Sequence, residues 1–164
     1  MQQFSLMQQQ LLLMQQQLSK INQNMNNINI NIINNQELKF GDGKYIGQVV
    51  NSMAEGKGIW YGNNGNKYEG DWRNGKKDGK GIFYWNDGKR YEGDWRNGKQ
   101  EGKGINYYNN GDRYEGEWRN HLMEGKGIYY FNNGDRRMGD YYNDKEIGKH
   151  AYLTKNEEVE THNF

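Results

Sequence analysis

The chain contains no cysteine and no proline. The absence of cysteine excludes disulfide bonds and thiolate metal sites, and it is compatible with a reducing compartment. Aliphatic material is also scarce: 33% of the 164 residues are hydrophobic, whereas 14% are aromatic and 23 are glycine. This composition excludes a thick layered core, so we expect a thin structure that large aromatic contacts stabilise.

A strong charge of one sign is missing as well. The chain has 22 basic and 21 acidic residues, which give a formal net charge of +1. Proteins that bind nucleic acid usually carry a clear basic excess, so we expect no nucleic-acid partner. No apolar run approaches the roughly 20 residues of a membrane span. The segment before Leu11 lacks the basic residues of a secretory or mitochondrial leader, so a cytoplasmic location is expected.

Composition divides the chain into three zones. Residues 1–36 are rich in glutamine and asparagine, residues 37–148 hold the glycines and tryptophans, and residues 149–164 form a short polar tail. The middle zone is expected to form a repeat rod, and the predicted fold class depends on it.

An internal repeat dominates the middle zone. Tyr45, Tyr68, Tyr91 and Tyr114 begin four copies that are 23 residues long, and a degenerate fifth copy begins at Arg137. Four consecutive copies in strict register are typical of a tandem repeat architecture. The predicted fold class is therefore an all-β repeat rod.

Each copy has the pattern of one β-hairpin. In the first strand Tyr68, Gly70 and Trp72 share one face, and Asn74-Gly75 then supplies a turn that tolerates positive φ. Glycine-rich strands are weak unless large rings cover the bare backbone. The residues expected in this repeat core are Tyr45, Tyr68, Gly70, Trp72, Gly79, Gly81, Phe83, Tyr91, Gly93, Trp95, Gly102, Gly104, Tyr114, Gly116, Trp118, Gly125, Gly127 and Tyr129. Stacked hairpins at about 4.8 Å per strand predict a twisted antiparallel rod about 45 Å long.

The pattern Tyr-x-Gly-x-Trp, Gly-x-Gly-x-aromatic and Asn/Asp-Gly, with its period of 23 residues, resembles the MORN repeat (membrane occupation and recognition nexus). The resemblance covers residues 45–136 well and residues 137–152 partially. It implies an elongated, often curved β-sheet. Members of the family act as protein-interaction rods, dimerise, organise cytoskeletal and ciliary assemblies, or lie at membrane junctions.

Four departures from the pattern are visible. Val49 replaces tryptophan in the first copy, Asn106 replaces an aromatic residue in the third, and His121-Leu122-Met123 replaces the glycine-containing turn of the fourth. His150 replaces the second glycine of the fifth copy. Weakened end copies suit capping, whereas the internal departures reflect either tolerated drift or a local surface.

Catalytic chemistry has no recognisable carrier in the sequence. Without cysteine, the nucleophiles are a few serines and threonines outside any known motif. His121, His150 and His162 lack metal-ligand spacing. The recurring Gly-Lys-Gly triplets lie within predicted strands and not in a phosphate-binding loop. We expect no enzyme activity, no metal and no cofactor.

Carboxylates recur in ladders that could suggest acid–base chemistry. One acidic ladder consists of Glu69, Glu92 and Glu115, and a second consists of Asp71, Asp94 and Glu117. A basic ladder in the return strands consists of Lys57, Lys80, Lys103 and Lys126. Their repetition favours cross-strand ion pairs, each stabilising the sheet by about 0.2–1 kcal/mol.

The N-terminal zone carries an a/d heptad seam. Apolar residues alternate by three and four positions, and those expected to bind a partner are Met7, Leu11, Met14, Leu18 and Ile21. The seam predicts a helix from about Gln3 to Ile21. Residues 28–32 also alternate with period two, which favours a strand equally. A disordered low-complexity tail is the alternative for the whole segment.

Together these features favour a non-catalytic scaffold of a large cytoskeletal assembly. The likeness to small MORN proteins of radial spoke heads implies the ciliary axoneme, with other proteins, other MORN proteins or a second copy as partners. The alternative is a peripheral membrane adaptor that binds acidic phospholipids. Residues 45–136 contain 15 basic and 13 acidic residues without a polybasic cluster, so lipid binding is ranked lower.

Overall fold

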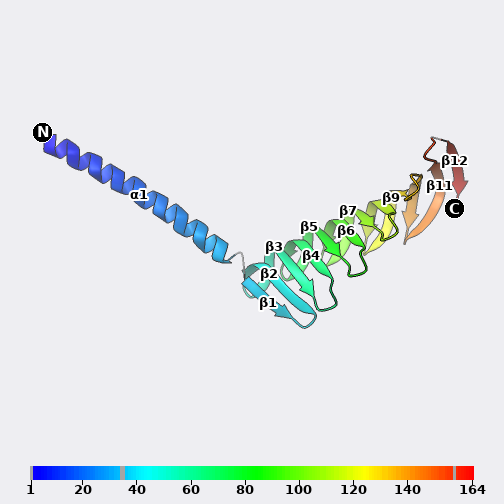
Figure 1. Cartoon of the computed structure of the whole chain (residues 1–164), viewed down its shortest axis with the longest axis horizontal. Helices are drawn as coiled ribbons and strands as arrows, with labels where there is room; N and C mark the ends of the chain where they lie inside the picture. Colours follow the sequence, from blue (N-terminus) through cyan, green and yellow to red (C-terminus); the bar gives the residue numbers. More distant parts are fainter. Residues whose placement is uncertain (1, 34–35, 157) are drawn as a thin grey trace.

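The structure is a computed structural model that describes residues 2–33, 36–156 and 158–164. A single helix, α1 (Gln2–Ile33), precedes twelve β-strands and points away from them (Figure 1). The strands are β1 (Gln36–Phe40), β2 (Gly43–Val50), β3 (Met53–Gly62), β4 (Lys67–Arg73), β5 (Lys76–Tyr84), β6 (Arg90–Arg96), β7 (Lys99–Tyr107), β8 (Arg113–Arg119), β9 (Leu122–Tyr130), β10 (Arg136–Tyr142), β11 (Lys145–Leu153) and β12 (Val159–Asn163).

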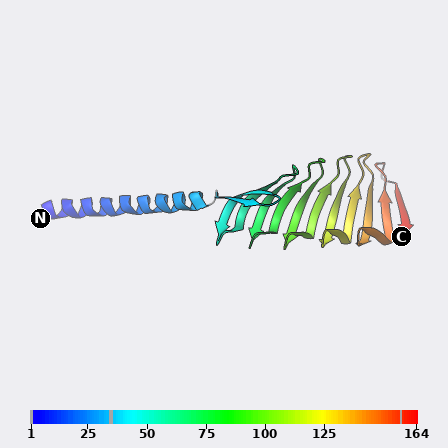
Figure 2. The same cartoon turned by 90° about the horizontal axis from the view of Figure 1, so that it is seen from below.

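All twelve strands form one open antiparallel sheet in the order of the sequence. Each strand pairs only with its neighbours along the chain, and the strands follow one another along the rod (Figure 2). Twelve strands at about 4.8 Å extend the sheet over roughly 53 Å. The predicted all-β rod with an N-terminal helix is confirmed. Among the described residues, no helix combines the length and apolarity that crossing a membrane requires.

The hairpin turns have the conformation that asparagine–glycine predicts. Asn74 and Gly75 have φ values of 49° and 74°, which is the left-handed region. Two consecutive left-handed residues match the right-handed twist of the flanking strands. In the fourth copy Asn120 and His121 adopt 50° and 74° at the same two positions. The sheet therefore fixes the turn even where glycine is missing.

Each return strand contains a bulge. Gly70 of β4 pairs with Gly81 of β5, but Trp72 pairs with Lys77, so three residues of β5 oppose one residue of β4. Gly79 lies in this bulge with φ of 113°, and a Cβ there would come within 2.7 Å of the Asp71 side chain. Gly79, Gly102 and Gly125 were expected in the repeat core on the same face as the ring-covered glycines, but the bulge places them against the acidic side chains of Asp71, Asp94 and Glu117.

The sheet is longer than the middle zone predicted from composition. It begins at Gln36, and β12 lies within residues 149–164, which were expected to be a polar tail. Helix α1 continues to Ile33, so the strand alternative for residues 28–32 is not adopted. Pairing with β11 supplies the order of β12 that polarity alone did not predict.

Candidate partner-binding surfaces

One face of the sheet is filled by aromatic rings. Tyr68 is 0% exposed, and its ring covers Gly81 so closely that a Cβ at that glycine would clash with it. The Tyr68 hydroxyl donates a hydrogen bond to the carbonyl oxygen of Asp71 at 3.0 Å. Burial raises the pKa of Tyr68 well above its usual value, so the hydroxyl keeps its proton. The predicted aromatic cover of the glycines is present.

Tryptophans join the second, third and fourth copies each to the copy before it. Trp95 Nε1 donates to the carbonyl oxygen of Gly81 in the preceding copy at 3.2 Å, and Trp72 and Trp118 repeat this bond. Tyr68 makes edge-on contacts with Trp72 at 5.3 Å and with Trp95 at 5.2 Å between ring centroids. The core therefore runs continuously through the copies. The predicted rings that are buried are Tyr45, Tyr68, Tyr91, Tyr114, Trp72, Trp95, Trp118 and Phe83, and Tyr129 is half-buried.

The fifth copy builds the same core with exchanged residues. Arg137 occupies the tyrosine position, and His150 occupies the position of a ring-covered glycine. His150 is 1% exposed, and its ring lies over Gly139, where a Cβ would clash with it. Its Nε2 donates to the carbonyl oxygen of Asp140 at 2.9 Å, which is the equivalent of the carbonyl that Tyr68 reaches. The loss of tyrosine at Arg137 is therefore compensated by His150, whose ring fills the same part of the core.

The series of rings continues to Phe164. His150 makes edge-on contacts with Tyr141 and with Phe164, each at 5.3 Å between centroids. Phe164 follows Tyr141 by 23 residues and so occupies the tryptophan position of a further half copy. The ring face is consequently a buried core from Tyr45 to Tyr141, and only the terminal ring, Phe164, is more than half exposed among the rings of this series.

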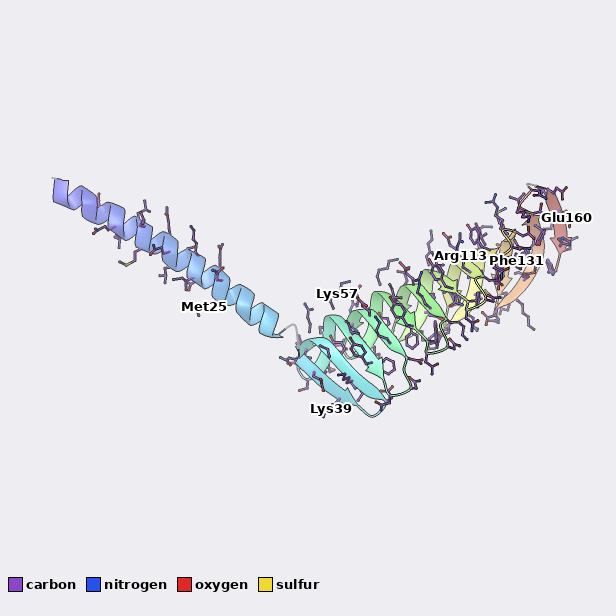
Figure 3. All side chains as sticks on the ribbon, viewed as in Figure 1. Met25, Lys39, Lys57, Arg113, Phe131 and Glu160 are labelled. Carbon is purple, nitrogen blue, oxygen red and sulfur yellow. The ribbon has the colours of Figure 1, made fainter. Side chains whose placement is uncertain are left out.

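The opposite face forms a groove of about 1390 Å³ along the sheet. The backbone of the ring-covered glycines makes its floor, because a Cβ at these positions would point to the ring face and the neighbouring side chains form the walls. One wall alternates isoleucine with glutamate: Ile59 pairs with Glu69, which in turn pairs with Ile82. The groove is lined by Ile46, Ile59, Ile82, Ile105, Ile128, Met138, Glu69, Glu92, Glu115, Glu117, Asp140, Lys57, Lys80, Lys103, Lys126, Lys149 and the intervening glycines. Lys57 projects from this side of the sheet in Figure 3.

The second wall of the groove is internally neutralised. Lys57 Nζ lies 2.6 Å from Asp71 Oδ1 of the next copy, and Lys80 Nζ lies 2.5 Å from Asp94 Oδ1. Partial burial would raise the pKa of Asp71, but hydrogen bonds from Lys57 and the Lys80 amide hold it below its usual value. These pairs confirm the predicted ladder for the aspartates. Glu69, Glu92 and Glu115 instead pair in register with isoleucines.

A lysine on the ring face was missed by sequence reasoning. Lys77 Nζ lies 4.4 Å from the ring centroid of Phe83, 5.2 Å from that of Trp60 and 5.4 Å from that of Trp95. Burial lowers the pKa of Lys77 to about 8. Met123 stands at the same position two copies later, so an apolar side chain also fits there. The repeat pattern does not predict this lysine, because the equivalent positions of the neighbouring copies are Ala54 and Gln100.

The predicted docking stripe lies on α1 and is open. The exposed fractions of Leu11, Met14, Leu18 and Ile21 range from 53% to 66%. The Met7 side chain lies outside the described residues. α1 has no acidic residue in its first turn and no basic residue in its last. The described apolar residues of this stripe are exposed, because α1 extends away from the sheet (Figure 1).

The internal departures differ in their burial. Asn106 is buried at 9% exposure, so it does not mark a surface. His121 is exposed, but its Nδ1 lies 3.4 Å from Gln100 Oε1, and partial desolvation together with the charges of Lys99 and Lys77 lowers the pKa of His121. Within the described parts of the chain, no three His, Cys, Asp or Glu side chains gather in a way that could hold a metal ion.

These features define an open, single-layer β-repeat rod with one filled face and one grooved face. The MORN repeat family matches residues 45–67, 68–90, 91–113 and 114–136, which is more than half of the chain. The chain therefore belongs to the MORN-repeat family. Repeats of this kind form protein-interaction or membrane-binding modules.

Other comparisons add little. No curated protein matches the chain. Among solved structures, a similar one is the TCP domain of SAS-4 (dCPAP) of Drosophila melanogaster, solved in complex with a proline-rich motif of Ana2 (dSTIL). The TM-score is 0.41 at 15% sequence identity, over 79% of this chain and 90% of that one. A likeness of this size carries no functional argument.

Proposed function

We propose that the protein is a non-catalytic scaffold that binds other proteins along its groove. The observation that carries this proposal is the contrast between the two faces. On one face the aromatic rings pack against one another. The other face has an open groove of about 1390 Å³ that is lined by isoleucines, charged side chains and glycine backbone. Apolar surface surrounded by polar residues is the usual composition of a protein-binding patch.

Within the cell, the scaffold is proposed to belong to a large cytoskeletal assembly, specifically the ciliary axoneme. This part of the proposal rests on the likeness in size and architecture to small MORN proteins of radial spoke heads. Expression of a fluorescently tagged chain in cells of the source organism tests it. Axonemal signal that resists detergent extraction supports the assignment, and a diffuse signal overturns it.

The groove also favours protein over acidic lipid. Three of its lysines, Lys57, Lys80 and Lys126, already form ion pairs with aspartates at 2.6, 2.5 and 3.3 Å. Anionic headgroups would have to compete with these carboxylates. We expect no recruitment to phosphoinositide-containing vesicles beyond that to neutral vesicles in flotation at physiological salt. Submicromolar, lipid-dependent recruitment would establish the membrane adaptor instead.

Affinity purification of the full chain tests the groove directly. Ile105→Asp places a charge on the apolar wall and should abolish co-purification of specific partners. Tyr142→Asp changes a residue that is 57% exposed and lies outside the groove lining, so it serves as the control. Equal loss of partners in both variants, or in neither, contradicts the groove as the binding surface.

A further inference from the structure

We propose that helix α1 of one molecule lies in the groove of a second copy, so that molecules associate head to tail. The inference rests on the proposed function of the groove and names its occupant. Both surfaces are open to solvent: the described seam residues of α1 are more than half exposed, and the groove has a volume of about 1390 Å³. A bare apolar stripe favours association, because an isolated helix is marginal in water.

The two surfaces repeat with nearly the same step. In the groove, one isoleucine recurs per copy at Ile59, Ile82 and Ile105, and two strands advance about 9.6 Å. On α1, Leu11 and Leu18 are one heptad apart, which is about 10.5 Å. One heptad can therefore face one copy. The difference accumulates to only about 3 Å over three steps, which flexible leucine and methionine side chains can absorb.

Their lengths agree as well. Helix α1 has 32 residues and extends over about 48 Å. The groove is lined from β2 to β11, ten strands that extend over about 43 Å. A single helix can thus cover the groove from end to end, whereas a shorter partner would leave isoleucines exposed.

Charge complementarity favours the same occupant. The groove lining contains five lysines and five carboxylates, so its charges balance. Residues 2–33 contain a single charged residue, Lys20. Glutamine side chains, such as Gln10, Gln15 and Gln17, both donate and accept hydrogen bonds and can meet glutamate and lysine in turn. A highly charged partner would place like charges against one of the two walls.

The direction of α1 selects a second molecule over the same one. The helix points away from the sheet and does not return over it (Figures 1 and 2). Its stripe is therefore presented to a neighbour placed further along the long axis. Such a contact joins two different surfaces, so it propagates into chains or closes into rings and does not stop at a symmetric dimer.

Complementation between two variants tests the arrangement in the full chain. Leu11→Lys/Leu18→Lys disables the stripe and leaves the groove, whereas Ile82→Lys/Ile105→Lys disables the groove and leaves the stripe. Sedimentation velocity should show concentration-dependent oligomers for the natural chain and association at least tenfold weaker for each variant alone. An equimolar mixture of the two variants should form a 1:1 dimer that grows no further.

Controls separate the possible outcomes. Leu12→Lys/Gln16→Lys adds the same charge to α1 outside the seam and should leave the oligomers intact. If circular dichroism shows that Ile82→Lys/Ile105→Lys does not fold, Glu92→Lys/Glu115→Lys replaces it on the same wall. Oligomers that persist in the groove variant indicate a helix–helix dimer and overturn the inference. A natural chain that stays monomeric at all concentrations, with its helix in its own groove or free, also overturns it.

Sedimentation velocity and affinity purification together distinguish this inference from the proposed function. A monomeric chain whose groove still captures specific partners in affinity purification refutes head-to-tail association alone. A chain that neither associates nor loses partners when Ile105 is changed refutes both.

Discussion

The interior copies and the fifth copy reach one architecture with different residues. In the interior, Tyr68 reaches from the first strand over Gly81 of the return strand. In the fifth copy, His150 reaches from the return strand over Gly139 of the first strand. Both rings donate to the equivalent backbone carbonyl. Each copy therefore requires a ring that fills the space over a glycine and donates a hydrogen bond to this carbonyl oxygen. Either strand of the hairpin can supply that ring.

The largest expected effect tests the interior side of this comparison. Trp95→Ala should lower the free energy of unfolding by about 3–5 kcal/mol, because the 5% exposed indole packs against rings of two copies and donates to Gly81. Urea titration measures the loss, and neighbouring copies should be destabilised with it. A loss below about 1 kcal/mol would mean that the indole is not part of the core.

The exchange in the fifth copy can be reversed. His150→Gly should cost about 2–3 kcal/mol, since it leaves a void over Gly139 and removes the donor to Asp140. Arg137→Tyr alone should also destabilise, because the new ring would compete with His150 for the same volume. The double variant restores the interior pattern and should recover most of the loss. Additive single effects in this double-mutant cycle would show that the two positions are independent.

The smallest expected effect concerns Lys77, which distinguishes the second copy from the others. Its folded-state pKa of about 8 lies below the unfolded value of about 10.4. The unfolded chain therefore binds more protons between these values, and stability should rise with pH across that window. We expect an increase of about 1–2 kcal/mol from pH 7 to 9.5 in urea titrations.

Lys77→Met should abolish this increase and keep the fold, as Met123 does at the equivalent position. Lys76→Met, at the exposed neighbouring residue, is the matched control and should keep the increase. The same pH dependence in both variants would show that another group is responsible.

Much of the fold could be predicted from the sequence because its order is local. The 23-residue period, the alternation around Tyr68 and Trp72, and the Asn74-Gly75 turn all depend on residues that are close in the chain. Gly79 could not be placed, because a bulge depends on the pairing of two strands and alternation within one strand does not reveal it. The role of His150 required knowing which carbonyl lies beneath its ring.

The candidate site was predicted only in part for a related reason. Alternation correctly assigned the aromatic rings to one face of the sheet, but on the opposite face isoleucines alternate with charged residues, and that mixture does not predict a groove. The isoleucines of the groove, such as Ile82 and Ile105, therefore drew no attention. The helical stripe was identified at Leu11 and Leu18, but periodicity alone could not decide between helix and strand beyond Ile21.

The hydrogen bond from Trp95 to Gly81 of the preceding copy fixes the spacing between neighbouring copies. Because Trp118 makes the same bond to Gly104, removal of any 23 consecutive interior residues brings a tryptophan back to an equivalent carbonyl. The molecule can therefore change length only in steps of about 9.6 Å, two strands at a time. Duplication or deletion of one copy in the gene would change the distance between partners bound at the two ends of the rod, and the contacts between neighbouring copies would stay the same.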